Sequence, residues 1–172
     1  MLRVAPLGIA GFVLAAMLTA CTLGDVIATW GVLHYAIDQQ CDAADRFDAR
    51  ARRQSPLGEG MARLVVFRQA TVIASGLRPD LALDGRNLGA LEAGRVIVVD
   101  VPAGEHRLDG GSEAKHALVL ALTAGETRVV QATPQPGWWN GWLPLAEITG
   151  EQAAGQLGTL CVRPLPDKAT VQ

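Results

Sequence analysis

Between residues 61 and 133, short apolar segments alternate with turn-forming residues and leave little room for helices. The clearest segments are ARLVVFRQA (62–70), GRVIVVDV (94–101), KHALVLAL (115–122) and ETRVVQAT (126–133). Their β-branched residues and alternating polarity are typical of strands. Turn signals recur about every 8–12 residues, a spacing typical of sandwiches and barrels rather than of βαβ units. We therefore expect a mainly β domain.

Hairpins are expected at two places within this region. DLALDGRNLGAL (80–91) reads as two short strands around Asp84-Gly85, because Asp-Gly suits the positive φ angles of a tight turn. EHRLD (105–109) and the segment 115–122 are expected to pair across Gly110-Gly111-Ser112.

The N-terminal segment indicates export. Met1-Leu2-Arg3 is followed by an uncharged run over residues 4–20 that ends Leu18-Thr19-Ala20 before Cys21. A basic start, an apolar run and small residues at its end are typical of a signal peptide, so we assign residues 1–20 to one. An uncleaved membrane anchor and an ordinary cleaved signal are the alternatives, although proline and glycine interrupt the apolar run.

The residues "LTAC" (18–21) resemble the lipobox of bacterial lipoproteins. The resemblance implies that the Cys21 thiol takes a diacylglyceryl group, that the chain is cut before Cys21, and that the new amine is acylated. Thr22 is not the aspartate that favours inner-membrane retention in many Gram-negative bacteria, so the periplasmic face of the outer membrane is the favoured location. Because export leads to an oxidising compartment, we expect Cys41 and Cys161 to form a disulfide, with two free buried thiols as the alternative.

Helices are expected on both sides of the β region. Residues 25–53 carry an apolar stripe at helical spacing, and residues 54–60 read as a linker. The stripe either packs on the domain or forms a membrane-surface or partner helix. Thr149 and Gln152 fit a capping box for a short helix over 151–160. The expected organisation is a signal peptide (1–20), a lipidated cysteine with amphipathic helix and linker (21–57), a β domain (58–150), and a short helix with a mobile tail (151–172).

The β region also resembles a known family. A first strand ends in Arg68, a hairpin carries Asp84, Gly85 and Gly89, a turn carries Pro102, Gly104 and His106, and a last strand begins with Ala124, Gly125 and Glu126. This order is similar to the DUF2846 domain of small bacterial lipoproteins, which is related in style to PEGA and other Ig-like sandwiches. The resemblance covers roughly residues 60–150. It implies an Ig-like antiparallel β-sandwich on a lipoprotein, and it implies no established activity.

Residues that could carry chemistry are sparse. His106 and His116 flank Gly110-Gly111 and could meet across the hairpin, but a zinc site would need further ligands such as Glu105 or Asp109. The serines lie in no GxSxG elbow, and the glycine-rich loops lack GxGxxG and a P-loop lysine. We therefore expect neither an enzyme nor a cofactor. The net charge of −2 also gives no electrostatic reason to expect nucleic acid.

The most unusual stretch is PQPGWWNGWLPL (134–145), which holds Trp138, Trp139 and Trp142. Its prolines and glycines mark a loop. Tryptophan is enriched at binding hot spots and membrane interfaces, so we assign these three rings to partner binding. The alternative is that some of them fold back to cap an open end of the domain.

These features together favour a lipid-anchored envelope protein that acts as a non-catalytic binding or scaffold module for other envelope proteins. Two other classes stay open. One is a small-ligand or glycan-binding lipoprotein that uses the tryptophan loop as a stacking platform. The other is a hydrolase whose site no motif reveals.

Overall fold

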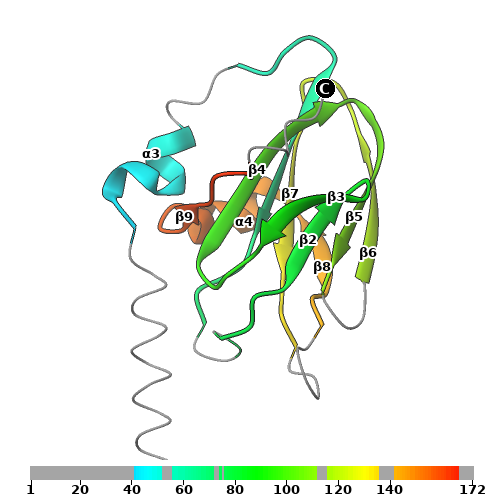
Figure 1. Cartoon of the computed structure of the whole chain (residues 1–172). Coiled ribbons are helices and arrows are strands. Elements are labelled where there is room, and N and C mark those ends of the chain that lie inside the picture. Colours follow the sequence, from blue (N-terminus) through cyan, green and yellow to red (C-terminus); the bar gives the residue numbers. More distant parts are fainter. Residues whose placement is uncertain are drawn as a thin grey trace, which may run out of the picture.

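The computed structural model describes residues 41–51, 56–71, 74, 76–111, 116–135 and 142–166 (Figure 1). Several predicted features lie outside these residues: the signal segment, Cys21, most of the helix over 25–53, Trp138, Trp139 and most of the C-terminal tail.

The described chain is mainly β and forms two sheets packed face to face as a sandwich (Figure 1). One sheet has five strands in the order β8-β7-β1-β4-β9, and the other has four in the order β3-β2-β5-β6. The strands are β1 (Met61–Phe67), β2 (Asp80–Leu83), β3 (Arg86–Ala90), β4 (Arg95–Pro102), β5 (Gly104–Gly110), β6 (His116–Leu122), β7 (Thr127–Ala132), β8 (Leu145–Ile148) and β9 (Cys161–Val162).

The first seven strands confirm the predicted segments within a few residues. Asp84 and Gly85 form the tight turn between β2 and β3, with φ angles of 51° and 78°. Most strand pairs are antiparallel as expected, but β1 pairs with β7 and β4 pairs with β9 in parallel. The β1–β7 pair is parallel because β5 and β6 intervene in the other sheet, so that β7 re-enters the first sheet beside β1 from the same end.

The main core lies between the two sheets, where alternate strand residues point inward. On β1, Ala62, Leu64 and Val66 face this core and are fully buried. They meet a leucine-rich layer from the second sheet. The layer consists of Leu81, Leu83, Leu88, Leu108, Leu120 and Leu122.

A second core covers the outer face of the five-stranded sheet. Val65 and Phe67 point to this face, where they pack with Ala153 and Leu157 of α4 (Gly150–Leu157). The predicted capping box holds the start of α4: Gln152 N–H donates to Thr149 Oγ1 at 3.2 Å, and Thr149 N–H donates to Gln152 Oε1 at 3.0 Å. The helix therefore stays fixed on the sheet although two glycines weaken its sequence.

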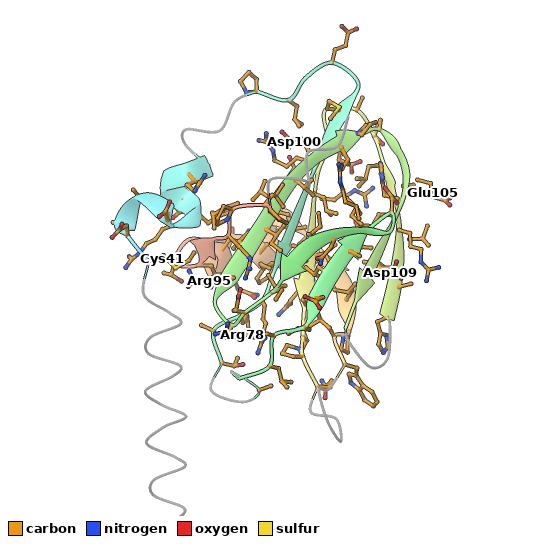
Figure 2. The ribbon with its side chains drawn as sticks, in the orientation of Figure 1. Cys41, Arg78, Arg95, Asp100, Glu105 and Asp109 are labelled. Carbon is orange, nitrogen blue, oxygen red and sulfur yellow. A yellow bond between two sulfur atoms is a disulfide. The ribbon has the colours of Figure 1, made fainter. Side chains whose placement is uncertain are left out.

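The expected disulfide is present, with Cα atoms of Cys41 and Cys161 6.1 Å apart. It joins the N-terminal segment to β9 at one side of the sandwich (Figures 1 and 2). The predicted continuous helix is wrong in this segment. A 3-10 turn (η1, Ala43–Asp45) and a short helix (α3, Phe47–Ala51) are separated by Arg46, which is extended and bridges to Cys161. Phe47 N–H also donates to Leu160 O at 2.8 Å, so contacts with the C-terminal segment override the helical periodicity.

Candidate functional site

Trp142 lies at the base of the tryptophan-rich loop, just before β8. Its backbone pairs with Gln135: Gln135 N–H donates to Trp142 O at 3.0 Å, and Trp142 N–H donates to Gln135 O at 3.2 Å. The Trp142 ring contacts the ring of His116 edge-on, with centroids 6.4 Å apart. The side chain remains 45% exposed, so part of the ring faces solvent beside the first residue of β6.

Leu143, the residue after Trp142, fixes the end of the tryptophan-rich loop to the sandwich. Leu143 is fully buried in the main core. Its carbonyl and side chain, together with Leu145, lie against Gly110 at the end of β5, where a Cβ atom would come within 3.2–3.3 Å of them. Gly110 is therefore a close-contact position, and Trp142 is held against the β5–β6 end of the domain on a well-packed base.

The strand β6 forms an edge of the four-stranded sheet and is paired on one side only, with β5. Ala117, Val119 and Ala121 point to the outer face and are exposed. Among the described residues, Val119 (56% exposed) and Trp142 are the two large hydrophobic side chains left exposed. Trp142 contacts His116 at the start of β6, and Val119 lies on the same strand. The strand β6 lies on the side of the sandwich away from α3 and β9 (Figure 1). We call β6 with Trp142 the β6 edge surface.

One hydrogen bond and the strand register show which backbone groups of β6 face outward. Asp84 N–H donates to Arg107 O at 2.9 Å, so the backbone polar groups of Arg107 point toward β2. Arg107 stands opposite Val119 in the β5–β6 register, and the pair is therefore a non-hydrogen-bonded one. It follows that Val119, and with it Ala117 and Ala121, present N–H and C=O groups at the free edge of the sheet.

The charged side chains near the β6 edge surface lie on the neighbouring strand, β5. Glu105, Arg107 and Asp109 occupy the outer face of β5, opposite Ala121, Val119 and Ala117. Figure 2 shows Glu105 and Asp109 on this strand. Arg107 forms an ion pair with Asp109 at 3.0 Å. The strand β6 itself carries no Asp, Glu, Lys or Arg, no proline and no bulge. Natural edges usually carry such devices against unwanted pairing, so this edge is unusually open to another strand.

The turn motifs that contain Asp84 and His106 meet at the opposite end of the β5–β6 hairpin. His106 Nδ1 lies 2.7 Å from Asp84 Oδ2, and His106 Nε2 lies 2.8 Å from Pro102 O. Asp84 Oδ1 also accepts from Arg107 N–H at 2.8 Å. The Asp-Gly hairpin and the Pro-Ala-Gly turn are thus tied together through one buried imidazole.

This contact shifts both ionisations. Burial alone would lower the pKa of His106, but its hydrogen bonds to Asp84 and to Pro102 O, with the charge of Asp84, raise it above its ordinary 6.5. Burial alone would raise the pKa of Asp84, but the hydrogen bonds from Arg107 N–H and His106, with the charge of the imidazolium, lower it below 3.8.

The other two motif residues also hold the fold. Arg68 is fully buried, and its guanidinium donates to Leu77 O at 2.7 Å, to Leu91 O at 3.1 Å and to Ala74 O. Glu126 accepts from Thr123 N–H at 2.9 Å and pairs with Arg128. The residues that carry the family resemblance therefore stabilise turns and loops of the sandwich.

The structure separates the two histidines considered for zinc. His106 stands opposite Leu120 and His116 opposite Gly110, at different ends of the β5–β6 pair. They are about 13 Å apart along the strands, so they do not share a site. Within the part of the chain that the structure describes, no group of three or more His, Cys, Asp and Glu side chains could hold a metal ion. Neither α3 nor α4 is long and apolar enough to cross a bilayer.

Sequence reasoning missed the edge of β6. The signal was present in HALVLAL, because an uncharged strand at the edge of a sheet is a pairing site. Its position at an edge depends on the strand order, which the sequence did not reveal.

No family model matches the chain, and no curated protein matches it at a significant level.

Proposed function

We propose that this chain is a lipid-anchored protein of the bacterial envelope whose sandwich acts as a non-catalytic binding or scaffold module. The observation that carries the proposal is the β6 edge surface, where Trp142 and Val119 are exposed beside unpaired strand groups. An exposed aromatic ring on a packed base suits the recognition of a protein partner through an aromatic anchor. Other envelope proteins are the proposed partners.

The disulfide supports the proposed location. Disulfides persist in oxidising compartments such as the periplasm and are rare in the bacterial cytosol. The bond between Cys41 and Cys161 thus agrees with export through a signal at 1–20 and anchoring at Cys21. Thr22 favours the periplasmic face of the outer membrane.

The family is part of the same proposal. The two face-to-face sheets, in which most strand pairs are antiparallel, suit an Ig-like sandwich. The meeting of Asp84 with His106 gives the DUF2846-like motifs a shared structural purpose. Both observations support a DUF2846-like domain on a lipoprotein.

The anchor is tested by mass spectrometry of the N-terminal peptide from the full chain expressed in a Gram-negative host. We expect a peptide that begins at Cys21 and carries acyl chains, and Cys21→Ser should retain the uncut precursor. Membrane separation should place the wild type with outer-membrane markers. A wild-type N-terminus without acyl groups would contradict the anchor, and inner-membrane fractionation would contradict the location.

The binding role is tested by reversible crosslinking in intact cells and mass spectrometry of the proteins that co-purify with a tagged chain. Trp142→Ala is compared with Arg50→Ala on α3. The Arg50 side chain forms an exposed ion pair with Asp45 of η1, and such a pair contributes little to stability. We expect a specific envelope protein that is recovered with wild type and Arg50→Ala and is lost with Trp142→Ala. Equal recovery from all three would contradict a partner site at Trp142.

The exposed Trp142 ring also suits a glycan-stacking site, which is the second candidate function. Quenching or a blue shift of tryptophan fluorescence during titration with peptidoglycan fragments would favour it. A protein partner recovered without any glycan response would favour the scaffold role.

A further inference from the structure

We infer that the β6 edge binds a second copy of this chain, so that two sandwiches join through antiparallel β6 strands. The inference goes beyond the proposed binding role: a second copy takes the strand, and the exposed Trp142 ring beside it stays available to another envelope protein. Residues 117–121 read Ala-Leu-Val-Leu-Ala, a palindrome centred on Val119. An antiparallel strand pair related by a two-fold axis at Val119 therefore places Ala117 opposite Ala121, Leu118 opposite Leu120, and Val119 opposite itself.

The backbone groups at the free edge fit this register. Val119, Ala117 and Ala121 direct their N–H and C=O groups outward, because Arg107 directs its own toward β2. In the two-fold register these three residues stand opposite the same three residues of the second copy. Each opposed pair can exchange both of its N–H···O=C bonds, so every outward group of the three residues finds a partner.

The side chains fit as well. Leu118 and Leu120 point to the core side and Val119 points to the outer face, so the pairing keeps apolar residues together on both faces. No like charges face each other at the seam, because the strand has none and Glu105, Arg107 and Asp109 lie on β5 behind it. A second copy supplies the same uncharged apolar strand, so one two-fold axis at Val119 satisfies both chains with the same residues.

The joined strands make one continuous sheet of eight strands from the two four-stranded sheets. Symmetry then places Trp142 beside His116 at both ends of the seam, roughly 20 Å apart along the strands. The surface left for other partners is thus doubled. Anchoring both chains in one membrane would raise their effective concentration and favour the pair.

The test is cysteine crosslinking of the full chain in the envelope of a Gram-negative host, with a mild oxidant and a non-reducing gel. In the two-fold register the Cα atoms at position 119 of the two chains are about 5.5 Å apart, within disulfide reach. We expect Val119→Cys to give a crosslinked dimer. Ala121→Cys should give none, because its two copies are about 13 Å apart along the strands.

Co-expression of two different cysteine variants tests the register directly. A differently tagged pair of chains, one with Ala117→Cys and the other with Ala121→Cys, should crosslink to each other. The wild-type chain, which retains Cys21, Cys41 and Cys161, controls for crosslinks at native cysteines. Equal crosslinking of Val119→Cys and Ala121→Cys, or no crosslink at either position and none in the mixed pair, would overturn the inference.

A second variant keeps the fold and removes the pairing. Val119→Lys places a charge on an exposed position, and in the dimer it would stand directly opposite its copy. We expect the purified full-length chain in detergent to sediment as a protein dimer for wild type and as a monomer for Val119→Lys, with equal melting of the β structure. A monomeric wild type would overturn the pairing. The double variant Trp142→Ala/Val119→Cys should still form the crosslinked dimer. Failure of the pairing is therefore distinguishable from failure of partner binding at Trp142.

Discussion

Asp84 and His106, 22 residues apart in the chain, are joined by a 2.7 Å hydrogen bond between a carboxylate oxygen and Nδ1. The second ring nitrogen faces the carbonyl oxygen of Pro102 at 2.8 Å. Both partners are acceptors, so the ring donates from both nitrogens only when it carries two protons and a positive charge. The contact is therefore a charged hydrogen bond between two turns, and it depends on pH.

The stability of the domain should depend on pH through this pair. The raised pKa of His106 means that its contribution is full below about pH 6.5 and is lost as the pH rises through the folded-state pKa. The lowered pKa of Asp84 means that its contribution is full above about pH 3.8 and is lost as the pH falls through the folded-state pKa. Urea unfolding should thus show the largest contribution of the pair between these limits.

His106→Gln is the variant that checks this dependence. It keeps a polar side chain but cannot become charged, and we expect a loss of about 1–2 kcal/mol of unfolding free energy near pH 5.5. The loss should shrink as the pH rises through the folded-state pKa of His106, because the imidazole then loses its charge. A difference between wild type and variant that stays constant from pH 5.5 to 9 would contradict a charged His106.

Arg68 should be one of the most sensitive polar positions in the sandwich. Arg68→Met keeps much of the buried volume but removes the donors to Ala74, Leu77 and Leu91 carbonyls. We expect a loss of roughly 3 kcal/mol in urea unfolding, because buried carbonyl groups are left without these donors. Arg68→Lys should recover only part of it, since an ammonium group lacks the planar fork of donors. If Arg68→Met is as stable as wild type, the segment around Ala74 and Leu77 does not depend on its hydrogen bonds from Arg68.

The sequence predicted the first seven strands because their β-branched residues and glycine turns act locally. It missed β8 and β9 because LAEI and CV are too short to show a period, and tertiary pairing makes them strands. The long helix fails at Arg46 for the same reason, since a bridge to Cys161 outweighs a helical stripe. Trp142 could be proposed from composition alone. The open edge at Val119 could not, because strand order is a property of the whole fold.

Removal of the disulfide should destabilise the domain substantially. The bond closes a loop with a sequence separation of 120 residues, for which chain entropy gives an upper figure of about 4–5 kcal/mol. We expect Cys41→Ala/Cys161→Ala to lower the denaturation midpoint, and reductant to do the same to the wild type. The double variant should no longer respond to reductant. Equal midpoints for oxidised wild type, reduced wild type and double variant would contradict a stabilising bond.

Gly110 should not tolerate a side chain. Gly110→Ala brings a Cβ atom within 3.2–3.3 Å of Leu143 and Leu145, including the backbone oxygen of Leu143. We expect a loss of about 1–3 kcal/mol from overpacking, measured by thermal unfolding. Gly155→Ala on α4 is the matched control, because nothing lies within 4 Å of its added Cβ. The control should stabilise by about 0.5–1 kcal/mol as a helical glycine-to-alanine change. If the domain tolerates both substitutions, Leu143, the residue after Trp142, cannot pack closely against β5.

The central claim is that the surface at Trp142 contacts another envelope component. The most direct measurement replaces Trp142 by a photoreactive benzoylphenylalanine in the full chain and irradiates intact cells, with the same group at the exposed Glu151 on α4 as control. The account predicts a light-dependent adduct with a specific envelope protein, other than a second copy of the chain, from position 142 and not from position 151. The same adducts from both positions, or none from position 142, would contradict it.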